Sequence, residues 1–351
     1  MKERQTAVAE AKQPVGRRVH REFGLGDAEA LDLYYGMLVT RKISQAALKL
    51  AFQGSIDVSI PSDGHEAAQI ASMRALRPTD PVYLFYRSLP AAYARGMTTR
   101  EIFLDYFGRR DGPSSGGKNL AGHWAKRELN LMSVSGSVAT QIPHAVGSAL
   151  AAKLRGDDSV SVAYFGDGGS SKSDFHDGLN FAAVHQLPVV LFCENNGVAI
   201  SVPFEKQSGV ARVADRAVGY AVVGISVDGA DPLQVYRVMR EAVEAARAGQ
   251  GPALIEARVT RLGQHTSQVG ESREPREMAA ARRHDPIPRF GRYLRHHGLL
   301  DDTLQAELEA RAQCEVDDGI DFASHAPPPA VDRAFADVYA APTPGGSLSG
   351  R

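Results

Sequence analysis

The sequence predicts an α/β fold with a doubly wound, mostly parallel sheet and a helical C-terminal part. Short apolar, β-branched runs at 160–165, 188–194 and 253–259 are typical of parallel strands that are buried on both faces. Stretches with apolar residues at helical spacing lie between them, and strands that alternate with helices indicate a parallel sheet. The last part, 286–340, is charged and helical, and we expect it to pack on the edge of the sheet or on a partner.

The middle of the chain predicts one strand–helix–strand crossover. Apolar residues recur at helical spacing over 138–153, ahead of the strand at 160–165. The turn GDGGSS leads from that strand into a helix over 174–186, and the strand at 188–194 closes the unit. Its length is that of a right-handed crossover, about 30 residues.

A second unit of the same kind lies further along the chain. Asp231 and Pro232 are typical of a helix N-cap and a first-turn proline. The helix that they begin ends at Gly249, and the strand at 253–259 follows it. Because no linker separates the two units, we expect a single domain over 21–340.

The two ends of the chain are polar. Residues 1–20 and 341–351 are predicted to be a mobile N-terminal extension and a disordered tail. The N-terminal segment lacks the apolar run of a secretory signal, and no apolar stretch is long enough to cross a membrane. Two cysteines are too few for a disulfide framework. We therefore expect a reduced, intracellular protein in a bacterial cytoplasm, with a mitochondrial matrix as the open alternative.

The bulk composition excludes some classes of function. Of the 351 residues, 43% are hydrophobic and 23% are charged, a balance that allows a sizeable buried core. The formal net charge is -1, so no basic field indicates a nucleic-acid partner. No phosphate loop of the GxxxxGK(S/T) type occurs, which argues against a nucleoside triphosphatase.

Polar residues follow both strands of the predicted crossover. A Gly-Asp-Gly turn centred on Asp167 follows the first strand, and Asn195 and Asn196 follow the second. Because ligands of α/β proteins bind at the carboxyl ends of parallel strands, we expect these residues to be neighbours at a binding site. The glycines and the N-terminus of the next helix suit a phosphate group. Asp167 and Asn196 offer the oxygen ligands that magnesium takes.

Two other interpretations of this turn remain open. An ordinary strand-to-helix connection would use the same residue types. A dinucleotide fingerprint would use the glycines for a pyrophosphate and Glu194 for the ribose. That fingerprint needs a third glycine where Ser171 stands, and it leaves Asn195 and Asn196 without a role.

The spacing of the Gly-Asp-Gly turn and the Asn-Asn pair resembles the signature of the thiamine-diphosphate-binding fold. Further segments, in the same order, resemble the α subunit of branched-chain 2-oxo-acid or pyruvate dehydrogenases. These segments are GHEAAQIA (64–71), LFYR (84–87), SVATQIPHAVG (137–147), DFHDGLNFAA (174–183), ENNGVAIS (194–201), VDGADP (227–232), RLGQHTS (261–267) and DPIPRF (285–290).

The resemblance implies a bound thiamine diphosphate and a magnesium ion. Asp167 and Asn196 would bind the ion through their side chains, and Val198 through its backbone carbonyl. Tyr86 and Arg87 would contact the diphosphate, for which a guanidinium fork is suited. The other positions that would line the cofactor are Gly136 and Val138, at the aminopyrimidine ring, and Gly168, Gly169 and Glu194.

The resemblance also implies a catalytic residue and a second ion. His265, in the loop RLGQHTS, would contact the diphosphate and assist transfer to a lipoyl group. We expect its pKa to lie near the working pH, as proton transfer requires. Ser135, Thr140 and Gln141 resemble a structural potassium site of some family members.

Two segments depart from the family pattern. Lys172 stands where the family commonly has an acid. The segment QVGESREPRE (268–277) replaces an acidic run that ends in Tyr-Arg. Because the family's loop orders around the cofactor, we expect this segment to affect lipoyl docking and activity. Thr266 and Ser267 are candidates for control by phosphorylation.

The implied function is oxidative decarboxylation of a 2-oxo acid, with transfer of the acyl group to a lipoyl-bearing acyltransferase. The ATQIP and DPIPRF segments favour a branched-chain acid such as 2-oxoisovalerate, and pyruvate and acetoin are the alternatives. The family's activating glutamate lies on a separate β subunit, so an α2β2 heterotetramer is expected. A non-catalytic regulatory or assembly paralogue and a nicotinamide dehydrogenase are the alternatives from other classes.

Overall fold

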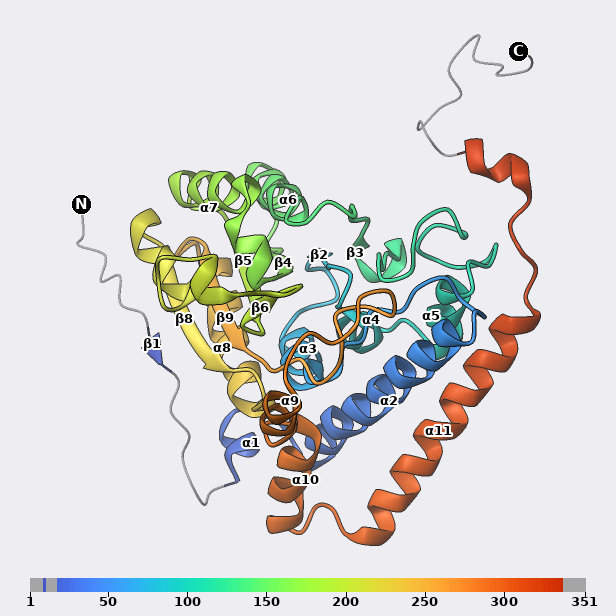
Figure 1. The fold of residues 1–351 in the computed structure, drawn as a ribbon. Coiled ribbons are helices and arrows are strands. Elements are labelled where there is room, and N and C mark those ends of the chain that lie inside the picture. The colour runs from blue at the N-terminus through green and yellow to red at the C-terminus, as the bar shows by residue number, and fades with distance from the viewer. Residues whose placement is uncertain (1–8, 11–17, 337–351) are drawn as a thin grey trace, which may run out of the picture.

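A seven-stranded sheet runs through the centre of the computed structural model, which describes residues 9–10 and 18–336 (Figure 1). Its order is β1-β8-β9-β5-β4-β2-β3, and every neighbouring pair is parallel. The strands are β1 (Ala9–Glu10), β2 (Val82–Tyr83), β3 (Leu131–Met132), β4 (Ser161–Gly166), β5 (Val189–Asn195), β8 (Val223–Asp228) and β9 (Ala253–Arg258). The predicted α/β fold with a mostly parallel sheet is confirmed.

The three strands predicted from apolar runs form as β4, β5 and β9, each within one residue of its predicted bounds. β4 and β5 stay paired as far as Gly166 and Glu194, and β5 and β9 as far as Asn195 and Arg258. The carboxyl ends of three adjacent strands therefore lie side by side at one edge of the sheet.

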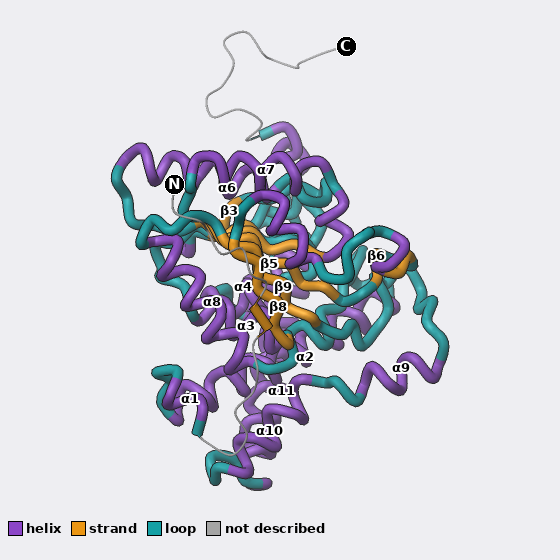
Figure 2. Tube along the Cα trace, turned by 90° about the vertical axis from the view of Figure 1, so that its left-hand side faces the viewer, coloured by secondary structure: helices purple, strands orange, loops and turns teal. Residues whose placement is uncertain are grey.

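Helices cover both faces of the sheet, which is the doubly wound arrangement (Figure 2). The helices on one face are α6 (Gln141–Arg155) and α7 (Ser173–His185), and those on the other are α3 (Glu66–Arg74) and α8 (Pro232–Arg247). Alternate residues of β5 point to opposite faces. Leu191 and Cys193 join the apolar core that α6 and α7 share, whereas Val190 and Phe192 join the core that contains α3 and α8. A strand with both faces buried is apolar throughout, which explains why these runs were recognisable.

The predicted start of α8 is confirmed in its details. The Asp231 side chain accepts hydrogen bonds from the backbone nitrogens of Leu233, at 3.1 Å, and Gln234, at 3.2 Å. Pro232 occupies the first helical position, where its missing N–H costs no hydrogen bond.

The C-terminal part is helical, as predicted, but its longest helix does not pack on the edge of the sheet. The elements are α9 (Pro275–Arg282), α10 (Pro286–His296), α11 (Asp302–His325) and a 3-10 helix, Val331–Phe335. α11 packs along α2 (Asp27–Phe52) and α5 (Thr99–Tyr106), so the expectation that it packs on the edge of the sheet is wrong, and the alternative of a partner contact stays a prediction (Figure 1). Glu315 of α11 links it to both helices, because it accepts hydrogen bonds from Tyr35 of α2 at 2.8 Å and Thr99 of α5 at 2.6 Å.

The remaining elements are α1 (Val19–Glu22), α4 (Leu89–Arg95), an antiparallel hairpin of β6 (Val198–Ala199) and β7 (Val202–Pro203), and 3-10 helices at Arg127–Leu129, Asp167–Ser171, Phe204–Lys206 and Val213–Tyr220. Most of the predicted N-terminal extension and the whole predicted tail, 341–351, lie outside the described residues. Within that extension, Val19 and His20 are buried in α1. In the described part of the chain, no helix has both the length and the apolar character needed to span a membrane.

Candidate cofactor and metal site

A cavity of about 250 Å³ opens at the carboxyl edge of the sheet. Its walls come from segments that follow strands, the place where α/β proteins bind ligands. The described residues that line it are Phe85, Tyr86, Arg87, Ser135, Gly136, Ser137, Val138, Gln141, Phe165, Gly166, Asp167, Gly168, Gly169, Lys172, Asn196, Val198, Ala199, Ile200 and His265. All residues predicted for thiamine diphosphate, magnesium and catalysis are among them except Glu194.

Asp167 and Asn196 lie next to each other on the cavity wall. The Asp167 carboxylate, which is 2% exposed, accepts hydrogen bonds from the backbone N–H of Asn196 and from Gln207 Nε2 at 3.2 Å. Burial still raises the pKa of Asp167. The chain by itself therefore compensates the ionised carboxylate poorly, and a bound cation would provide the missing charge.

The two adjacent asparagines have different surroundings. Asn195 Nδ2 donates to Glu256 Oε1 at 2.7 Å, and Asn195 Oδ1 accepts from the backbone of Gly197 at 2.9 Å. Asn195 thus ties the turn to β9. Asn196 lines the cavity, and its Oδ1 accepts from the backbone of Val198 at 3.2 Å. An amide oxygen has a second lone pair, so Asn196 can hold the turn and ligate a cation together.

The β6–β7 hairpin brings Val198 to the same wall. Gly168 makes this approach possible, because a Cβ atom at that position would lie 2.9 Å from the Cβ of Ala199. Gly197 has a φ of +79°, a left-handed conformation that favours glycine. One carboxylate, one amide and the backbone of the hairpin form an oxygen-rich donor set, which fits magnesium.

His265 lies between two buried arginines. Nη2 of Arg87 is 3.1 Å from Nδ1 of His265, and Nη1 of Arg261 is 3.4 Å from the same atom. Because a guanidinium only donates hydrogen bonds, Nδ1 accepts them, and the neutral imidazole carries its proton on Nε2. The ring of Tyr86 stands edge-on to the imidazole, with 6.0 Å between the ring centroids.

The expectation that the pKa of His265 lies near the working pH is wrong for this structure. Burial, and then the charges of Arg87 and Arg261, lower the pKa of His265 to about 4. Burial and the charge of Arg87 also lower the pKa of Arg261, to about 10. Two buried cations beside a cavity fit a polyanion such as a diphosphate, and its negative charge would raise the pKa of His265 again.

Sequence reasoning passed over Arg261, although it opens the motif RLGQHTS. Its guanidinium is 1% exposed and lies at the end of β9, the same edge that carries Asp167. The available signal was a basic residue just beyond a predicted strand, four positions before the histidine.

Glu194 lies behind the cavity wall. Its Oε2 accepts a hydrogen bond from Gln69 Nε2 at 2.7 Å and lies 2.6 Å from Nδ1 of His65, and all three side chains are fully buried. Because Glu194 is fully buried and does not line the cavity, its carboxylate is not placed to contact a ribose there, which removes the observation that favoured a dinucleotide site. The motif GHEAAQIA contains both His65 and Gln69, but nothing in its spacing indicates that they meet Glu194.

The residues of the predicted potassium site are only partly brought together. Ser135 and Gln141 line the cavity, whereas Thr140 does not. Gln141 Nε2 donates to the carbonyl of Tyr164 at 2.8 Å, and Thr140 Oγ1 donates to the carbonyl of Ser137 at 2.9 Å. Lys172, the departure from the family pattern, is exposed and lines the same cavity, so the change from acid to base alters its rim.

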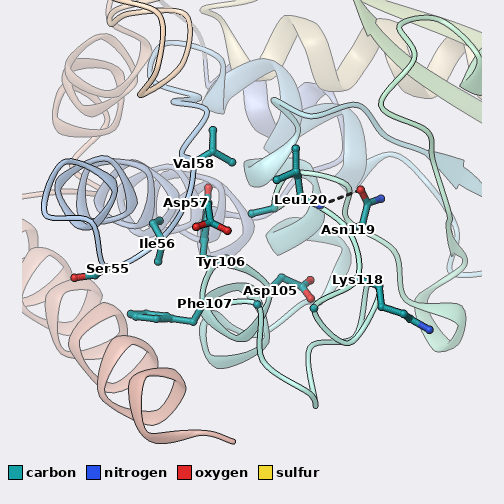
Figure 3. Close-up of a pocket in the computed structure, with 13 residues that line it drawn as sticks. Ser55, Ile56, Asp57, Val58, Asp105, Tyr106, Phe107, Lys118, Asn119 and Leu120 are labelled. Atoms are coloured by element: carbon teal, nitrogen blue, oxygen red, sulfur yellow. Dashed lines mark hydrogen bonds between the residues drawn. The ribbon is translucent and has the colours of Figure 1, made fainter. Parts of the chain in front are cut away.

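A second cavity, of about 320 Å³, lies between residues 55–58, 105–108 and 117–121 (Figure 3). Burial raises the pKa of its Asp105 to about 7, but that carboxylate is already used by Ser114, whose backbone donates to it at 3.3 Å. No buried arginine lines this cavity among the described residues, so we place the candidate site in the smaller one.

Comparisons with known proteins agree with this geometry. The model of the family described as dehydrogenase E1 component matches residues 34–332. The chain is 40% identical to the 2-oxoisovalerate dehydrogenase subunit alpha of Bacillus subtilis (strain 168), over 92% of this chain and 98% of that protein. It is 38% identical to the 3-methyl-2-oxobutanoate dehydrogenase subunit alpha of Mycobacterium tuberculosis (strain ATCC 25618 / H37Rv), over 94% and 87%. It is 35% identical to the pyruvate dehydrogenase E1 component subunit alpha of Staphylococcus aureus (strain N315), over 83% and 77%.

Proposed function

Because this chain belongs to the family of dehydrogenase E1 components, we propose that it is the α subunit of a thiamine-diphosphate-dependent 2-oxo-acid dehydrogenase that prefers a branched-chain acid such as 2-oxoisovalerate. The acyl group would pass to a lipoyl group of the complex's acyltransferase. The observation that carries the proposal is one cavity in which a cation-binding oxygen set, from Asp167 and Asn196, meets the guanidinium of Arg87.

The residues of this cavity fit the two groups that the family requires. Asp167, Asn196 and the Val198 carbonyl would hold magnesium, and Arg87 would contact the diphosphate. Arg261 does not line the cavity and would add its positive charge from its position beside His265. Gly136 and Val138 would contact the aminopyrimidine ring. Bound thiamine diphosphate supplies the electron sink for decarboxylation. A potassium ion at Ser135 and Gln141 is the weaker part of the proposal, because Thr140 points its hydroxyl to Ser137.

His265 would act first as a hydrogen-bond donor. Its Nδ1 is occupied by donors from Arg87 and Arg261, so the free N–H of the ring is at Nε2. An anion bound by the two arginines would offset their charge and raise the pKa of His265, which would then be able to exchange a proton. The role of His265 thus depends on an occupied diphosphate site.

We expect a separate β subunit to complete the enzyme as an α2β2 heterotetramer. The relatives are named as alpha subunits, and this chain covers nearly the whole length of the Bacillus protein. The purified chain alone should therefore be inactive, and activity should appear when it is co-expressed with its β partner. Oxidation of a 2-oxo acid by the chain alone would refute this assembly.

The substrate preference is tested by steady-state rates of the reconstituted enzyme. We expect the highest kcat/KM with 2-oxoisovalerate and lower values with pyruvate and acetoin. The pyruvate dehydrogenase of Staphylococcus aureus is also similar, so a higher kcat/KM with pyruvate is the main competing outcome.

The alternative of a non-catalytic paralogue depends on whether the cofactor binds. Titration calorimetry of the complex with thiamine diphosphate and magnesium separates the two functions, because a regulatory paralogue need not bind either. We expect saturable binding that requires both components, and absence of binding would favour the paralogue.

A further inference from the structure

The segment that follows β9 folds back on itself around His265. The Arg273 side chain donates from Nη1 to the carbonyl of Arg261 at 2.6 Å, and from Nη2 to the carbonyl of Gly263 at 2.8 Å. One guanidinium thus closes a loop of which His265 is a member. This contact lies at the centre of the segment 268–277, which departs from the family pattern.

Glu271 holds Arg273 in that position. Nε and Nη2 of Arg273 donate to the two carboxylate oxygens of Glu271, at 2.8 and 2.6 Å, and the backbone N–H of Arg273 donates to the same carboxylate at 3.0 Å. These hydrogen bonds lower the pKa of Glu271 to about 2, so the pair remains ionised at neutral pH. The Arg273 and Glu271 side chains are only 17% and 24% exposed, so water screens their attraction only in part.

The other side of the loop is held by a different segment of the chain. The backbone N–H of Leu262 donates to the carbonyl of Asp63 at 3.0 Å, and that of Ser267 donates to the carbonyl of Ser59 at 2.8 Å. These contacts fix both ends of the loop against residues 59–63. Near the first of these ends, Arg273 donates to the carbonyls of Arg261 and Gly263, which flank Leu262.

We propose that Arg273, oriented by Glu271, is a positioning residue that holds His265 against Arg87. The consequence for catalysis rests on the proposed function, whereas the claim that Arg273 holds His265 in place does not. The side chain does not touch the cavity, so Arg273 acts through the backbone of residues 261–263. Arg261 belongs to the same unit, because its Nε also donates to the Gly263 carbonyl at 3.1 Å.

The geometry requires an arginine. A planar guanidinium can donate to two carbonyls and one carboxylate at the same time, because its five N–H groups lie in a fixed fork. A lysine ammonium would keep the charge but could not span the same acceptors. Arg273→Lys should therefore disturb the loop less than Arg273→Gln does, but should still leave it less ordered than in the unchanged protein. An effect of this intermediate size would show that the geometry of the guanidinium contributes in addition to its charge.

Hydrogen-exchange mass spectrometry of the reconstituted α/β complex tests the proposal independently of activity. In Arg273→Gln we expect amides of residues 262–268 to exchange roughly tenfold faster, because the loop opens locally. Amides of β4 and β5 should exchange as in the unchanged protein, which shows that the variant is folded. Arg276→Gln is the matched control, since Arg276 is exposed on α9 and loses the same charge.

Kinetics provide the second measurement. Misplacement of His265 should lower kcat of Arg273→Gln roughly tenfold, with little change in KM for the 2-oxo acid, because the substrate does not contact Arg273. Equal exchange of residues 262–268 in Arg273→Gln and the unchanged protein would overturn the proposal. If the unchanged complex oxidised no 2-oxo acid, the proposed function would fail, and the exchange measurement would still decide the role of Arg273.

Discussion

The wall of the cavity that β4 and β5 form and the wall that residues 261–273 form are held by different kinds of contact. The first wall is an extension of the sheet, because β4 and β5 are paired up to Gly166 and Glu194. Behind it, Glu194 is bound by His65 and Gln69 in the protein interior. The second wall is a loop whose shape depends on side chains, chiefly Arg273 and Arg87.

The charges of the two walls also differ. The strand wall presents a buried carboxylate, Asp167, whose pKa is raised by burial. The loop wall presents the imidazole of His265, whose pKa is lowered, and the buried cations Arg87 and Arg261 lie beside that imidazole. The negative charge of Asp167 is compensated poorly by the chain, and the positive charges beside His265 are compensated only in part. A ligand that carries a divalent cation on a polyanion satisfies both, which explains why one cavity contains both walls.

The largest effect is expected from the strand wall. Asp167→Asn removes the only carboxylate among the proposed metal ligands, so activity of the reconstituted enzyme should fall by roughly a thousandfold or more. Thermal stability without cofactor should not fall, because the ionised Asp167 is disfavoured by burial. Steady-state rates and scanning calorimetry measure these two effects, and titration calorimetry measures the binding of thiamine diphosphate and magnesium. Asp157→Asn, at an exposed loop position, is the matched control. Near-normal binding of thiamine diphosphate and magnesium would place the metal elsewhere.

A smaller effect is expected from the loop wall. His265→Gln keeps a hydrogen-bond donor but cannot exchange a proton, so acyl transfer to a lipoyl acceptor should slow by roughly a hundredfold. Affinity for thiamine diphosphate should change little, since Arg87 and Arg261 remain. Single-turnover rates of decarboxylation and of acyl transfer separate the two steps. His284→Gln, at an exposed histidine, should leave both rates unchanged. Full activity of His265→Gln would mean that the loop wall shapes the cavity but takes no part in proton exchange.

The pH dependence of stability sharpens the comparison further. The pKa of His265 is about 4 in the folded chain, below the 6.5 of an unperturbed histidine. The unfolded chain therefore binds the proton more readily, and the contribution of His265 to stability is full above pH 6.5 and is lost as the pH falls towards 4. Without cofactor, the difference in Tm between the unchanged protein and His265→Gln should change over this window. A difference in Tm that stays constant over this pH window would show that the pKa of His265 is not lowered in the folded protein.

The smallest effect is expected where the backbone would be the ligand. Val198→Ala keeps the carbonyl and the β6–β7 pairing, so activity should change by no more than about threefold. Steady-state kinetics at several magnesium concentrations are the measurement. A large increase in the magnesium requirement would mean that the Val198 side chain, rather than its carbonyl, shapes the site.

Much of the strand wall could be predicted from the sequence because its rules are local. Apolar runs indicate β4 and β5, and the parallel crossover then requires that Asp167 and Asn196 meet. Which of the two asparagines faces the cavity could not be predicted. Asn195 turns to Glu256 on β9, a strand 61 positions away in the sequence, while Asn196 faces the cavity. No local pattern encodes that choice.

The sequence by itself therefore determined the fold class, the edge of the sheet that carries the site, and most residues that line the cavity. Only the tertiary structure decided how the long polar side chains pair. Arg87 reaches His265 across 178 positions, and Glu194 turns inward to His65 across 129. The physical reason is range: backbone periodicity and turn chemistry act over a few residues, whereas burial and charge act between whatever side chains the packed fold brings together. For the same reason the pKa of His265 could not be foreseen, because it is set by burial and by two arginines that only the fold places beside it.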